Sequence, residues 1–65
     1  MVSQKDIFIS AQLLIKKHGD HAETIAERRM QEMMERDDAK GASVWFSILS
    51  SLEDLRAMKQ QRQLH

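Results

Sequence analysis

Apolar residues return every three or four positions in three stretches of this chain, which is the spacing of one face of an α-helix. These stretches predict helices over about residues 4–17, 21–36 and 39–60. Proline is absent, and the two glycines, Gly19 and Gly41, stand where the apolar spacing breaks, as expected for helices joined by tight turns. The pattern therefore predicts one all-α domain over residues 1–65, a small three-helix bundle whose tail at 61–65 frays.

Short polar residues stand at the expected ends of the first two helices, where they can satisfy free backbone groups. Ser3 precedes the first helix and can accept a hydrogen bond from its first turn. Gly19 suits the left-handed position that follows a helix, so that His18-Gly19-Asp20 should form a tight turn. Asp20 and Glu23 have the spacing of a capping box for the second helix.

The start of the third helix is less sharply marked. Asp37 and Asp38 are two candidate N-caps. Gly41 lies either in the first turn or just before it, because a glycine there costs a helix only about 1 kcal/mol relative to alanine. Both placements of Gly41 stay open at this point.

The apolar residues gather on one side of each helix when successive residues are placed about 100° apart. The first helix contributes Ile7, Phe8, Ala11, Leu14 and Ile15, the second Ala22, Ile25, Ala26, Met30 and Met33, and the third Val44, Trp45, Ile48, Leu52 and Leu55. We expect these three arcs to form one core in which Trp45 packs against the first two helices.

Composition and charge narrow the class of protein. The chain has 65 residues and no cysteine, so a thin core must hold it without disulfides or thiolate metal sites. It has neither a long apolar run nor the layout of a signal peptide, and we expect a cytoplasmic protein that does not enter a membrane. Ten basic side chains balance ten acidic ones, so that no net field draws nucleic acid or anionic lipid to the surface.

Two motifs lie between Ala11 and Leu55. They read His18-Gly19-x-x-Ala22 and Gly41-x-x-Val44-Trp45-x-x-Ile48-Leu49. With them the chain resembles a family of short uncharacterised bacterial helical proteins, a domain of unknown function. The resemblance implies a compact helical fold and brings no chemistry with it. Family members often have a charged residue after the tryptophan, where this chain has Phe46.

Residues with the potential for metal binding or catalysis are few. His18 and His21 are three residues apart, a spacing that can hold a metal ion on one helix. Gly19 breaks the helix between them, and the one other histidine is His65, so we predict no metal site and no cofactor. Without cysteine, tyrosine or a serine placed near a histidine, the sequence also predicts no enzyme and no small-molecule substrate.

Arg29 falls inside the apolar arc of the second helix, where its charge needs a partner. In a structural interpretation its stem packs against the core and its guanidinium reaches a helix-end carbonyl or a carboxylate such as Asp6, Asp37 or Asp38. In a functional interpretation it binds an anion together with nearby basic residues. The structural interpretation is favoured, because no glycine-rich loop supplies an anion pocket.

Several large apolar residues lie outside the arcs or extend beyond the shorter helices. They are Ile9, Leu13, Met34, Phe46, Leu55 and Met58. On so small a domain they predict a protein-interaction surface, because methionine adapts to irregular partners and aromatic residues dominate interface energies. We therefore expect a small protein-interaction module that binds a protein partner or a second copy of itself.

The alternatives are a nucleic-acid-binding helical module and a monomer without an interaction role. Three short helices with a tight turn can imitate a helix-turn-helix. The second helix, however, mixes four glutamates among its arginines, which is unfavourable for contact with phosphates.

Overall fold

The computed structural model describes residues 3–63, with side chains described from Ser3 to Met58. These residues form α1 (Gln4–His18), the short 3₁₀ turn η1 (Gly19–His21), α2 (Ala22–Glu35) and α3 (Ala39–Gln63). No strand occurs within them, and the predicted all-α class is confirmed for this part of the chain. Because η1 continues directly from α1 into α2, the described chain consists of two helical runs separated by residues 36–38.

The expected helix ends agree with the observed ones to within one residue, except at the end of α3. The sequence places that end near residue 60 and predicts fraying from residue 61, whereas α3 continues to Gln63. The rest of the predicted frayed tail, Leu64 and His65, lies outside the described residues.

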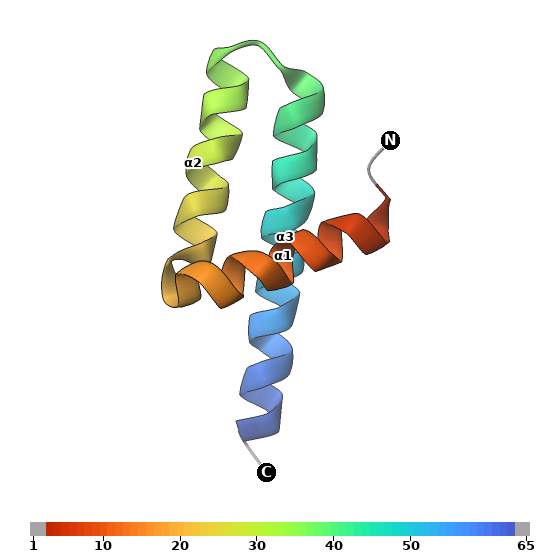
Figure 1. Ribbon diagram of the computed structural model, residues 1–65, viewed down its shortest axis with the longest axis vertical. Coiled ribbons are helices and arrows are strands. Elements are labelled where there is room, and N and C mark those ends of the chain that lie inside the picture. The colour runs from red at the N-terminus through yellow and green to blue at the C-terminus, as the bar shows by residue number, and fades with distance from the viewer. Residues whose placement is uncertain (1–2, 64–65) are drawn as a thin grey trace.

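The helices form two layers (Figure 1). Helices α2 and α3 run antiparallel side by side, and α1 lies across them, near the start of α2 and the middle of α3. The hairpin end of the α2–α3 pair and the C-terminal part of α3 extend on opposite sides of this crossing. The expected side-by-side packing of a bundle is therefore present for α2 and α3, while α1 is a crossing helix. The molecule measures 44 × 22 × 17 Å as a result.

The turn between α1 and α2 is built on a glycine in a conformation that other residues rarely adopt. Ser3 caps α1 as predicted, because its Oγ accepts a hydrogen bond from the Asp6 backbone N–H at 3.2 Å. At the other end Gly19 has the expected positive φ of 56°, but its ψ is −122°, which is outside the left-handed helical region. This conformation leads the chain straight into η1 instead of into a separate capped helix.

The predicted capping box at the start of α2 is wrong. Asp20 lies within η1, and the residue before α2 is His21, whose side chain makes no capping hydrogen bond. The extra 3₁₀ turn separates Asp20 from the first residue of α2. The carboxylate of Glu23 accepts hydrogen bonds from Arg56 instead.

The turn between α2 and α3 is a Schellman motif with an aspartate in the position that usually holds glycine. The Asp38 N–H donates to the Met33 carbonyl at 2.8 Å and the Asp37 N–H to the Met34 carbonyl at 3.0 Å, while Asp37 has a φ of 60°. Asp38 then caps α3, since its Oδ1 accepts from the Gly41 N–H at 2.9 Å. Gly41 therefore lies inside the first turn of α3.

The core lies where α1 crosses α2 and α3. Its fully buried members are Ala11, Ala22, Ala26, Ile48 and Leu52. Small alanine side chains allow α1 and α2 to lie close to α3. Partly buried residues surround this centre, namely Ile7, Leu14, Ile15, Val44, Trp45, Leu49 and Leu55.

Two expectations about the core need correction. Phe8 is 42% exposed because it lies at the margin of the α1 arc and lines an open hollow instead of the core. Trp45 packs against the core as expected but is only partly buried, because it also lines an open groove between α1 and α3.

Candidate functional site

An apolar groove lies where α1 crosses α3. It has a volume of about 480 Å³ and is lined by Ser10, Leu13, Leu14 and Lys17 of α1 and by Val44, Trp45 and Ile48 of α3. The α1 residues fall at intervals of three and four, so they share one side of the helix. Ser10 and Lys17 supply its polar atoms, and Leu13 is 54% exposed.

A second hollow of about 600 Å³ lies along the N-terminal half of α1. It is lined by Gln4, Lys5, Ile7, Phe8, Phe46, Ser47, Ser50, Ser51 and Asp54. Two phenylalanines meet a largely polar wall here. All the described polar and charged side chains of the molecule reach solvent, those of this hollow included, so it lacks the shielded polar groups that orient a small ligand.

The structure does not gather the predicted interaction residues into one patch. Leu13 lines the apolar groove and Phe46 the second hollow, so these two residues belong to different surfaces. Ile9, Met34 and Met58 are between 43% and 56% exposed and line neither hollow. Leu55 packs against the core and is partly buried.

Arg29 is a solvent-exposed residue, in contrast to the expectation that its stem would pack against the core. Its side chain is 54% exposed, and Nη1 lies 3.2 Å from Oε2 of Glu32, one helical turn further along α2. The expected partners Asp6, Asp37 and Asp38 are not its partners. Arg29 lies one turn beyond the buried Ala26 on the same side of α2, yet it is exposed, so the burial of this side does not extend to it.

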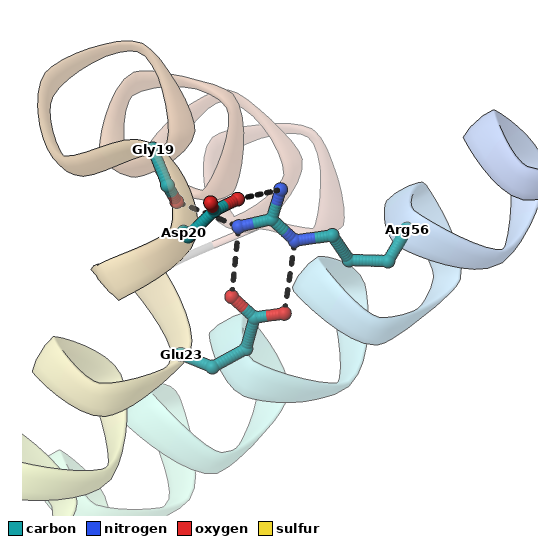
Figure 2. Close-up of polar contacts among 4 residues, drawn as sticks. All are labelled: Gly19, Asp20, Glu23 and Arg56. Carbon is teal, nitrogen blue, oxygen red and sulfur yellow. Dashed lines mark hydrogen bonds and ion pairs between the residues drawn. The ribbon is translucent and has the colours of Figure 1, made fainter.

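Arg56 is the charged residue that joins the helices, and the sequence did not single it out. Figure 2 shows its guanidinium between the start of α2 and the turn that precedes it. Nε and Nη2 each donate to a carboxylate oxygen of Glu23 at 3.0 Å, and Nη2 donates to the Gly19 carbonyl at 2.6 Å. Nη1 is 3.8 Å from Oδ1 of Asp20.

Arg56 therefore joins α3 both to the start of α2, through Glu23, and to the turn, through the Gly19 carbonyl. The hydrogen bonds from Arg56 hold the pKa of Glu23 below its usual value of 4.5, although partial burial opposes the effect. Because bidentate pairing fixes the orientation of both side chains, it also fixes where α3 lies against η1. A signal was present in the sequence, since Arg56 follows Trp45, Leu49 and Leu52 at helical spacing on the inner side of α3.

The described residues contain neither a group of metal-ligating side chains nor a membrane-spanning helix. No three of their histidine, aspartate or glutamate side chains are grouped closely enough to hold a metal ion. His18 and His21 are exposed at the two ends of the Gly19 turn, and His65 lies outside the described part. Within that same part, no helix combines the length and apolar character needed to cross a membrane.

Comparison with known proteins does not add a family to these observations. No family model matches the chain, and no curated protein or solved structure matches it. Functional inference therefore rests on the groove and the charges around it.

Proposed function

We propose that this chain is a small non-enzymatic protein-interaction module, a three-helix domain that binds a partner in the groove between α1 and α3. The observation that carries the proposal is the apolar lining of that groove, where Leu13 is 54% exposed and Trp45 only partly buried. Tryptophan is enriched among the residues that dominate binding energy, and burial of apolar surface stabilises a complex by about 25 cal/mol per Å².

An amphipathic helix suits this groove better than a small molecule does. The groove is bounded by two helices and opens to solvent, a form that accepts the apolar face of a third helix. Lys17 stands at its rim, where its stem can cover apolar surface while its ammonium group stays in water. A cytoplasmic location, favoured by the cysteine-free sequence, is part of the same proposal.

Site-specific photo-crosslinking in living cells tests the proposed function. A p-benzoylphenylalanine in place of Lys17 puts the reactive group at the rim of the groove. The matched control has the same group in place of Gln31, which is exposed on the side of α2 opposite the buried Ala22. We expect protein adducts of defined mass from position 17 and none of the same mass from position 31. Identical adducts from the two positions, or adducts from neither, would contradict a binding role for the groove.

A further inference from the structure

The monomer exposes more surface than its mass requires. Its accessible surface is 5330 Å², whereas a compact monomer of 7.6 kDa is expected to expose about 4,300 Å². The excess of about 1,000 Å² belongs to the chain as a whole, and the hairpin end is one of the regions that contribute to it. The excess arises from the crossing geometry, because both ends of α3 extend past α1 (Figure 1).

The uncovered face of the hairpin can be located from burial along one arc of α2. Ala22 and Ala26 are fully buried, but Arg29, next along the same arc, is exposed. The cover that α1 provides therefore ends soon after Ala26. From there to the end of α2 at Glu35, Arg29 and Met34 are exposed while Met30 and Met33 remain partly buried. We call this stretch of α2, together with the groove at Trp45, the open face.

The open face carries one basic and one acidic side chain, Arg29 and Glu32, which could pair with the same two residues of a second chain. Arg29 and Glu32 lie near the middle of the uncovered stretch of α2, and their side chains are 54% and 35% exposed. When two such helices meet antiparallel across a twofold axis, the arginine of each copy lies opposite the glutamate of the other. The chain as a whole carries equal numbers of basic and acidic residues, so that two copies do not repel each other.

We propose that a second copy of this chain covers the open face about a twofold axis perpendicular to α2. Arg29 of each copy pairs with Glu32 of the partner subunit, and the hairpin end of each copy lies against α1 of the other, over the groove formed by Leu13 and Trp45. A twofold contact requires only one self-complementary patch, and this one avoids a clash because the two α1 helices lie at opposite ends. The inference rests on the proposed binding role of the groove and names its partner.

Charge exchange between two single variants tests this arrangement. The Arg29→Glu variant has acidic residues at positions 29 and 32, and the Glu32→Arg variant has basic residues at both. Because like charges then face each other across the axis, each variant alone should dimerise at least roughly tenfold more weakly than the wild type. An equimolar mixture should form a heterodimer, because every contact across the axis is then between opposite charges. Native mass spectrometry separates the three possible dimers, and circular dichroism verifies that each variant is folded.

The mixture distinguishes pairing between copies from the Arg29–Glu32 contact within one helix. Each variant chain carries like charges at the two positions, so no ion pair within a chain can produce the recovery. Glu27→Arg, on an exposed part of α2 away from the open face, is the control and should dimerise like the wild type. Single variants that dimerise like the wild type, or a mixture without heterodimer, would overturn the proposed arrangement.

A wild type that stays monomeric at millimolar concentration would overturn the second copy as the partner. The proposed function would survive that result if photo-crosslinking from position 17 still captured a different protein. The two proposals therefore fail separately.

Discussion

The crossing of α1 and the hairpin end of α2 and α3 are built from similar sequence patterns but have opposite environments. At the crossing, Ala22, Ala26 and Leu52 are fully buried, and Arg56 ties α3 to the start of α2. At the hairpin end the same helices expose Arg29 and Met34. The difference shows that a helical arc gives the direction in which side chains point, whereas the position of the third helix decides which of them are covered.

The largest expected effect is at the crossing, where Leu52 is the one large side chain that is fully buried among the described residues. Leu52→Ala should lower the free energy of unfolding by about 3–4 kcal/mol, because it leaves a cavity in a thin core. Met34→Ala at the hairpin end should change it by less than about 0.5 kcal/mol. Urea unfolding followed by circular dichroism measures both values. Similar losses for the two variants would show that the hairpin end is as tightly packed as the crossing.

The turn at the crossing should be sensitive to any side chain at Gly19. A Cβ added there meets no atom within 4 Å, so the cost of Gly19→Ala comes from the backbone conformation alone. That cost should exceed the roughly 1–2 kcal/mol of a left-handed helical residue, because φ is positive and ψ of −122° lies outside that region. Thermal unfolding checks it, and an unchanged melting temperature would mean that the turn does not require this conformation.

The turn at the hairpin end should respond in the opposite direction. Asp37 has a φ of 60°, a conformation that glycine adopts without strain. Asp37→Gly should therefore stabilise the protein by about 1 kcal/mol, although the greater freedom of the unfolded chain offsets part of the gain. The same thermal measurement applies, and a destabilised variant would indicate that the Asp37 side chain has a role of its own.

The smallest effect concerns the pH dependence of the Arg56–Glu23 pair, because both side chains are partly in solvent. The hydrogen bonds from Arg56 lower the pKa of Glu23 below 4.5 in the folded state. The pair therefore stabilises the fold fully above about pH 4.5, and this contribution is lost as the pH falls through the lower, folded value.

Comparison of wild type with Arg56→Met at several pH values tests this linkage. The wild type should be more stable at neutral pH, and the difference should shrink as the solution is acidified below about pH 4.5. Arg28→Met, a change at an exposed residue of α2, is the control. A difference between wild type and Arg56→Met that stays constant on acidification would contradict the role of the Glu23 carboxylate.

The features predicted correctly from the sequence depend on residues close together in the chain. The Ser3 cap, the positive φ of Gly19 and the Asp38 cap each involve positions a few residues apart. The crossing of α1 depends instead on alanine contacts between helices and on Arg56, which bonds a residue 33 positions away. Without that geometry, Arg29 was placed with the core instead of on the open face.

The candidate site was predictable only residue by residue for the same reason. Leu13 was identified as a spare apolar residue, but its meeting with Trp45 in one groove follows from the crossing. Phe46 has a similar exposure of 59%, yet it lies in the second hollow and outside the open face. Sequence spacing alone does not distinguish these two positions.

The fluorescence emission of Trp45 across a wide range of protein concentrations reports whether a second copy covers the groove. Trp45 is the only tryptophan of the chain and lines the groove, so its emission reports whether the groove is covered. If a second copy covers it, the emission maximum should shift to shorter wavelength between nanomolar and millimolar protein. Leu13→Glu should abolish the shift, and Phe46→Glu should preserve it. Wild-type emission that is the same at every concentration would show that no second copy covers Trp45.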